Sequence, residues 1–207
     1  MSSAILKTSL LCLVSAILCA LLNVASCASS SDAACPIGAL QFLAWPDIRF
    51  AVWFNWVNWV PGLVFGALFS LSAIAWQQPG QASRGVGFIL LSGLIYLLAG
   101  PLFTLVLVGA SPLHSERILN WLLPDGLITG LFGSFALSAS ARLLLRPADD
   151  SRSTAAWLGI TALIGAVAGL AFVATARSAS DSLAASWSLA FAVWQIPVGL
   201  ALKRQIA

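Results

Sequence analysis

The sequence predicts an all-α fold, a polytopic transmembrane helical bundle formed by a single membrane domain that covers residues 1–207. Composition is the first reason, because 60% of the residues are hydrophobic and only 8% are charged, whereas soluble domains carry about 25% charged residues. The mean hydropathy of +0.96 is the second reason, since a soluble domain of this size could not bury so much apolar surface. The third reason is that apolar stretches near the length of a membrane span, about 20 residues, recur along the chain.

Six apolar segments predict six spans, which are joined by short connections without a soluble appendage. Residues 1–26 are the first span or a cleaved signal, residues 27–50 form an outer loop, and residues 51–207 form the rest of the helical bundle. The apolar segments lie near residues 5–25, 61–76, 86–110, 124–145, 155–176 and 183–202.

The first segment has two explanations. Lys7, the apolar run 10–22 and Cys27 resemble a bacterial lipoprotein signal that is cleaved before a lipidated Cys27, and they also resemble an ordinary secretory signal peptide. A retained helix is favoured, because the positively charged region holds a single lysine and lipidated polytopic proteins are uncommon. Retention predicts six spans and cleavage predicts five, with the same orientation for the rest of the chain.

The outer loop contains Cys27 and Cys35, on the side of the membrane where disulfides persist. A Cys27–Cys35 disulfide and two unpaired cysteines both remain open, because spacing alone does not fix the pairing. Cys12 and Cys19 lie inside the first apolar segment and are interpreted as small hydrophobic residues. The chain has no C-x-x-C pair, and we predict no metal site.

Residues 50–76 carry a face of small and amide side chains, which lies opposite a side rich in valine and leucine at 100° per residue. In a bilayer, small and amide residues mark the side that faces other helices, because hydrocarbon solvates valine and leucine well. The tryptophans here belong either to the interfacial aromatic belt or to a cradle for an apolar ligand. The predicted ligand-binding or helix-packing face consists of Asn55, Asn58, Trp59, Gly62 and Gly66.

Pro61 divides the same stretch and allows two interpretations. One is a kinked, tilted helix in which the carbonyl of Val57 loses its usual partner. The other starts the span at Pro61 as the first helical residue and lays the tryptophan-rich part along the interface. We favour the second, because the stretch is too long for one perpendicular span.

The later segments show further helix-packing signals. Pro101 predicts a kink within the third segment. The fourth segment contains Gly126 and Gly130, and the fifth contains Gly165 and Gly169, both with the spacing typical of close helix contact. At the second, fourth and sixth segments a Trp is followed by a Pro and a Gly, in the sixth as Trp-Gln-Ile-Pro-Val-Gly. These faces predict a dense bundle rather than a wide pore.

The basic residues predict the orientation, since cytoplasmic connections carry an excess of lysine and arginine. The side with the basic excess holds both termini, so both are expected in the cytoplasm and the protein is expected in a bacterial cytoplasmic membrane as a multi-pass protein. The basic residues on this side are Lys7, Arg84, Arg142, Arg146, Arg152, Lys203 and Arg204.

Several classes of chemistry are disfavoured. A proton-driven pump generally places an ionisable residue deep in the membrane, whereas the spans hold only amides and hydroxyls such as Asn58, Thr129 and Gln195 away from their ends. His114 is the single histidine, which cannot supply paired haem ligands, and we predict no cofactor. The basic residues form no dense cluster with interleaved aromatics, so we expect no nucleic-acid partner.

The alternative function is a membrane enzyme with a site on the outer face. Asp125, His114 and Glu116 are its candidate catalytic residues, because a carboxylate beside the membrane can act as a base or bind a metal. The favoured interpretation of Asp125 is structural, since Pro124 followed by Asp125 is a normal helix start in which the carboxylate meets the positive end of the helix dipole. No recognised catalytic motif is present.

The leading hypothesis is therefore non-enzymatic. It is an integral membrane protein that binds or passes an apolar or neutral small molecule or a lipid, or that serves as an accessory subunit of a membrane complex. The expected partners are membrane lipids and either another integral membrane protein or further copies of the same chain.

Overall fold

The computed structural model describes six stretches of the chain, and all of them are α-helices, so the predicted all-helical fold is confirmed. The described residues are 3–29, 56–72, 82–109, 118–145, 154–177 and 183–206. They form α1 (Ser3–Ser29), α3 (Trp56–Ser72), α4 (Ala82–Gly109), α5 (Ile118–Leu145), α6 (Thr154–Arg177) and α7 (Leu183–Ile206).

Four of the helices are long and apolar enough to cross a membrane, which makes the chain a multi-pass membrane protein by length and composition. α3 supplies a shorter apolar stretch, Trp59–Leu71. α7 combines an apolar helix with the polar Gln195 and with basic residues in its last turn. The four candidate spans are Ile5–Leu22, Ala82–Ala99, Gly126–Leu145 and Ala155–Phe172.

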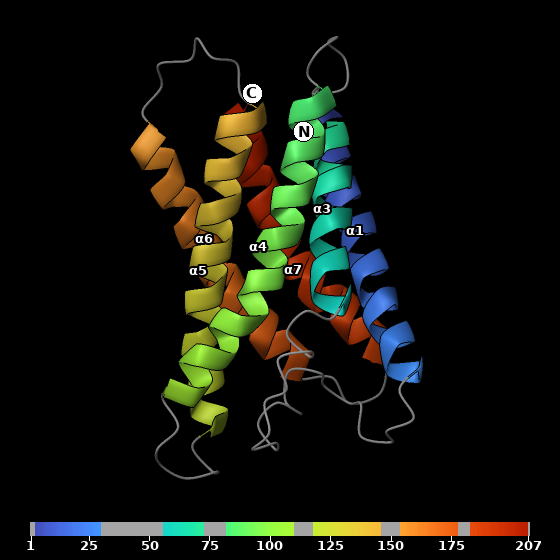
Figure 1. The fold of residues 1–207 in the computed structure, drawn as a ribbon, viewed down its shortest axis with the longest axis vertical. Coiled ribbons are helices and arrows are strands. Elements are labelled where there is room, and N and C mark those ends of the chain that lie inside the picture. The colour runs from blue at the N-terminus through green and yellow to red at the C-terminus, as the bar shows by residue number, and fades with distance from the viewer. Residues whose placement is uncertain are drawn as a thin grey trace.

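The helices form a ring in chain order (Figure 1). Each helix packs against the one that follows it, and α7 closes the ring by packing against α1. The helices alternate in direction along the chain, so neighbours in the ring are antiparallel (Figure 1). The connections that follow α3 are short and favour this up-and-down arrangement, because they leave no room for a crossover. α7 also contacts α5, which brings it toward the middle of the ring.

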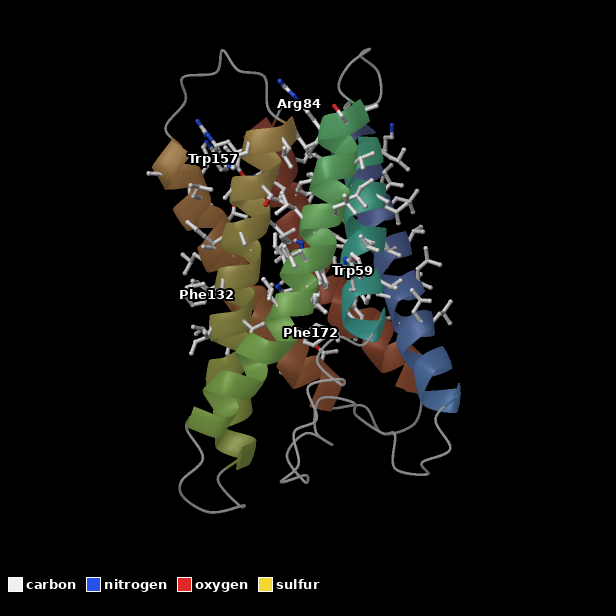
Figure 2. All side chains as sticks on the ribbon, in the orientation of Figure 1. Trp59, Arg84, Phe132, Trp157 and Phe172 are labelled. Atoms are coloured by element: carbon white, nitrogen blue, oxygen red, sulfur yellow. The ribbon has the colours of Figure 1, made fainter. Side chains whose placement is uncertain are left out.

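Figure 1 shows the N- and C-termini at the same end of the bundle. The basic residues whose side chains the structure describes belong to helix ends on this side. Arg84 lies at this end together with Trp157 of the first turn of α6 (Figure 2). The shared end agrees with the grouping of basic residues that the sequence predicts. The described basic side chains at this end are Lys7, Arg84, Arg142, Lys203 and Arg204.

The helix starts differ from those predicted. α3 already begins at Trp56 and continues through Pro61, so the interpretation of Pro61 as the first helical residue is wrong. Proline lacks only its own N–H, and the surrounding helices hold the chain in place despite that one missing hydrogen bond. α5 likewise begins at Ile118, well before Pro124. α1 runs through Cys27, which was expected at the start of the outer loop.

Aromatic rings fill the middle of the ring, between α3, α4 and α7. The rings of Phe65 and Phe69 stack with their centroids 5.9 Å apart, and Phe88 of α4 lies 5.6 Å from Phe69. All three side chains are fully buried or nearly so. The outward faces carry aliphatic side chains, such as Leu143 with 80% of its surface exposed. Such an outer surface is expected where hydrocarbon rather than water surrounds the protein.

Candidate functional site

The predicted face on α3 packs against α4. A Cβ atom on Gly62 would collide with the backbone oxygen of Ser92, and one on Gly66 would lie 2.9 Å from the Cα of Ile89. Contacts this short require glycine, since only glycine lets two helix backbones approach so closely. Gly62 and Gly66 therefore lie in a helix–helix contact, not beside an open cavity.

Trp59 belongs to the same contact. Its indole ring covers Gly93 of α4, where any Cβ would meet the ring, and 43% of the Trp59 surface stays exposed. Figure 2 shows Trp59 on the side of α3 that adjoins α4. Asn55 and the side chain of Asn58, the remaining members of the predicted face, lie outside the part of the chain that the structure describes.

α5 and α6 meet through glycines from both helices. A Cβ on Gly130 would collide with the carbonyl oxygen of Gly165, and a Cβ on Gly169 would collide with the carbonyl oxygen of Gly126. Each helix thus presents bare backbone to the other. Both of the predicted small-residue faces are buried in this contact, which leaves no space for a ligand between the two helices.

A polar cluster lies elsewhere in the ring, at the junction of α1, α3, α4 and α7. Gln195 of α7 is fully buried, and its Nε2 donates to Tyr96 Oη of α4 at 3.4 Å and to Cys19 Sγ of α1 at 3.6 Å. The Cys19 thiol in turn donates to the carbonyl oxygen of Pro61 at 3.6 Å. Ser15 Oγ lies 3.9 Å from the same sulfur. We call Ser15, Cys19, Tyr96 and Gln195 the polar cluster.

The hydrogen bonds of the polar cluster are long and incomplete. Strong N–H···O bonds measure about 2.9–3.0 Å, so the 3.4 Å bond from Gln195 to Tyr96 is a weak one. The Gln195 Oε1 atom is buried and has no hydrogen-bond partner among the described residues. A buried amide carbonyl without a partner costs about 1–3 kcal/mol. Only the NH₂ group of the Gln195 amide therefore has hydrogen-bond partners.

A second buried amide, that of Gln205, lies nearer the basic end of the bundle and has hydrogen-bond partners for both of its polar groups. Ser138 Oγ of α5 donates to Gln205 Oε1 at 2.6 Å, and Gln205 Nε2 donates to the Ser138 carbonyl oxygen at 3.5 Å. Both polar ends of Gln205 thus have partners on one neighbouring helix. The comparison separates Gln195 from Gln205, although the buried hydroxyls of Ser70, Ser92 and Ser134 also have no partner among the described residues.

Aromatic rings enclose the polar cluster. Trp194 meets Tyr96 edge-on, with ring centroids 5.5 Å apart, and Phe65 lies 6.3 Å from each of these rings. Edge-to-face rings of this kind form an apolar wall with fixed geometry. An amide carbonyl, a phenol and a thiol inside an apolar wall can hydrogen-bond one neutral polar group while the rings contact an apolar body.

The candidate catalytic residues are not brought together among the described residues. His114 and Glu116 lie outside the described part of the chain. The backbone of Asp125 lies inside α5, whose first turn contains no acidic residue, so the interpretation of Asp125 as a helix-start residue is wrong. The reason is that α5 extends past Pro124 to Ile118, which moves the positive end of its dipole away from position 125.

The structure describes the side chains of two of the four cysteines. Cys12 and Cys19 are buried and form no disulfide. Cys35 and the side chain of Cys27 lie outside the described residues, so the predicted alternatives for this pair stay predictions. Within the described helices, no three His, Cys, Asp or Glu side chains come close enough together to hold a metal ion.

Comparisons of the chain with protein-family profiles, with curated proteins and with solved structures find no match.

Sequence reasoning identified Gln195 only as one of several amides in the spans, and it missed Tyr96 and the polar contacts of Cys19. The available signal was that Tyr96 is the single tyrosine of the chain and lies in the interior of an apolar segment. A tyrosine in such a position usually finds a hydrogen-bond partner for its hydroxyl. The partner helix could not be inferred, because it depends on ring closure between the two ends of the chain.

Proposed function

We propose that this multi-pass membrane protein is non-enzymatic and binds a neutral, largely apolar small molecule or lipid at the polar cluster. The ligand contributes one hydrogen-bond donor, such as a hydroxyl or an amide N–H, to the open carbonyl of Gln195. Its apolar body contacts the rings that surround Tyr96. A charged ligand is disfavoured, because the described side chains around Gln195 carry no charge.

The single observation that carries this proposal is the buried Gln195 Oε1 without a partner, next to weakly bonded groups of two other helices. Glutamine is expensive to bury, and leucine or methionine would fill the same volume without a polar penalty. A polar side chain that is only half satisfied in the resting protein is the arrangement expected of a group that completes its hydrogen bonds with a ligand.

The accessory-subunit form of the hypothesis is less well supported. Membrane helices often associate through small-residue faces. Here the glycine pairs of α3, α5 and α6 are all used within one chain, as the collisions at Gly62, Gly130 and Gly169 demonstrate. These faces are therefore not available to a second membrane protein.

We further propose that all six helices span the membrane, with both termini in the bacterial cytoplasm. The basic side chains at one end of the bundle support this orientation. α1 acts in this proposal as a retained span, because Ala16, Cys19 and Ala20 are fully buried against the rest of the bundle. A signal segment that is removed after export would not be expected to carry a face of small residues that packs against the rest of the bundle.

Native mass spectrometry of protein gently extracted from its own membrane tests the ligand proposal. We expect a bound neutral molecule in the wild type and about tenfold lower occupancy in Gln195→Met, because one hydrogen bond to the ligand is lost. Gln205→Met is the matched control, since it removes a buried amide whose partners are already within the protein. Equal occupancy in Gln195→Met, or no bound molecule in the wild type, would contradict the proposal.

The enzyme alternative retains one supporting observation. Asp125 lies inside α5 beyond its first turn, so the helix dipole does not explain a carboxylate at this position. Asp125→Asn separates the two functions. The ligand proposal expects the variant to fold and to keep its bound molecule, whereas the enzyme alternative expects normal folding with loss of function.

A further inference from the structure

The basic ends of α1 and α7 lie side by side. The two helices are antiparallel neighbours, and Gly199 of α7 packs directly on the Cys12 sulfur of α1. One helical turn farther toward the termini, α7 reaches Lys203 and α1 reaches Thr8, because both helices rise by about 1.5 Å per residue. Lys7 adjoins Thr8 and is exposed, so the two lysines are level with each other at this end.

The two lysines repel each other in a partly desolvated place. Lys203 is half-buried, and burial lowers the pKa of its ammonium group, with the charge of Lys7 lowering it further. An anion placed between the two ammonium groups would remove this repulsion.

An apolar stripe continues from Lys7 along the outer face of α1. Leu10, Val14, Ile17 and Leu21 follow Lys7 at the spacing of one helix face, and all four are exposed, Leu10 by 58%. A free anion would make no contact with this apolar stripe. A lipid would contact it, because the acyl chain of a lipid lies along aliphatic side chains directly beneath the headgroup.

We propose that Lys7 and Lys203 bind the headgroup phosphate of an anionic phospholipid whose acyl chain lies along the exposed face of α1. Basic sites between membrane helices on the cytoplasmic side are suited to such headgroups. Both ammonium groups donate to the phosphate oxygens, and Lys7 and the stripe share one face of α1, so headgroup and chain are bound together. The site lies at the basic end of the bundle and does not depend on a ligand at Gln195.

Vesicles of equimolar phosphatidylglycerol and phosphatidylcholine, exchanged with the purified full chain and followed by native mass spectrometry, test the site. We expect selective retention of phosphatidylglycerol by the wild type. Lys7→Gln and Lys203→Gln should each lower its occupancy about fivefold, the effect of one basic residue near a membrane surface. Arg84→Gln is the matched control, since it removes one exposed charge from the same end on α4 and should change occupancy less than about twofold.

Three outcomes would overturn the proposal. They are equal retention of the two lipids by the wild type, equal losses in all three variants, and displacement of phosphatidylglycerol by an excess of inorganic phosphate. The last outcome would identify a site for a free anion in place of a lipid. Circular dichroism of each variant verifies that the helices are intact, so a loss of folding cannot imitate a loss of binding.

Discussion

Two regions hold the bundle together in opposite ways. One is the contact between α5 and α6, and the other is the junction of α1, α4 and α7. In the first, glycines bring backbone against backbone, as at Gly130 and Gly165. In the second, Tyr96 of α4 and Trp194 of α7 meet edge-on, and Gln195 reaches Tyr96 through a weak hydrogen bond. The first contact brings the two backbones together and leaves a buried hydroxyl, that of Ser134, without a partner among the described residues, whereas the second leaves an amide carbonyl open.

This difference indicates where stability and function reside in the protein. Backbone contact is intolerant of any added atom, since a backbone cannot move aside as a side chain can. Contacts between large side chains tolerate rearrangement, because rotamers and hydrogen-bond partners can change without moving a helix. Substitutions at the two regions should therefore have different consequences, and the three predictions that follow run from the largest expected effect to the smallest.

Gly169→Leu should have the largest effect. Its side chain would enter the space occupied by the Gly126 carbonyl group and would lie against the Cα of Gly130, which are both backbone. We expect a loss of about 3 kcal/mol or more in the free energy of unfolding, or no folded protein at all. The yield of monodisperse protein after extraction and its thermal unfolding temperature measure the effect.

Gly159→Leu is the control on the same helix. A Cβ at Gly159 meets no atom within 4 Å, so a leucine there should point away from the bundle at almost no cost. If Gly159→Leu and Gly169→Leu lowered the unfolding temperature equally, general damage to α6 would explain the result and the close contact with α5 would not.

The two buried glutamines should differ in stability. Gln205→Met breaks both hydrogen bonds with Ser138 and should cost about 1 kcal/mol, the usual value for hydrogen bonds between membrane helices. Gln195→Met loses only weak bonds and also removes an unsatisfied carbonyl, so it should cost less. Denaturant unfolding of both variants in the same detergent checks the order, and a larger cost for Gln195→Met would indicate a structural role.

The smallest effect concerns the basic end of α7. Burial and Lys7 both lower the pKa of Lys203 from its ordinary value of 10.5, so Lys7→Gln should raise that pKa toward 10.5. Between the lowered pKa and 10.5, the unfolded chain binds more protons than the folded one, and stability should rise with pH. NMR titration of isotopically labelled Lys203 measures the shift, and an unchanged pKa in Lys7→Gln would place the two lysines too far apart to interact.

The sequence was sufficient to predict the helical fold, because composition and span length constrain a membrane protein strongly. It also predicted which glycines have close-packing spacing, since Gly126, Gly130, Gly165 and Gly169 repeat at one-turn intervals. Helix starts were less predictable. Pro61 and Pro124 favour a first helical position locally, yet α3 and α5 both begin earlier, because packing against neighbouring helices outweighs a single missing hydrogen bond.

The polar cluster could not have been predicted, for a topological reason. Its members come from α1, α4 and α7, and Cys19 and Gln195 are separated by most of the chain. Hydrophobic periodicity identifies which residues share a face of one helix, but it gives no information on which helix that face meets. Only the order of helices around the ring brings a thiol from the first helix to an amide of the last.

The closed ring also implies an order of events during synthesis. Among the six described helices α1 is made before the others, yet its face that holds Ala16 and Cys19 packs against α7, which is made after the other five. Until α7 arrives, that face has only part of its final contacts, and the amide that bonds Cys19 is not yet present. Assembly of this bundle is therefore completed from its two ends, and truncation within α7 should leave the earliest helix without its final neighbour.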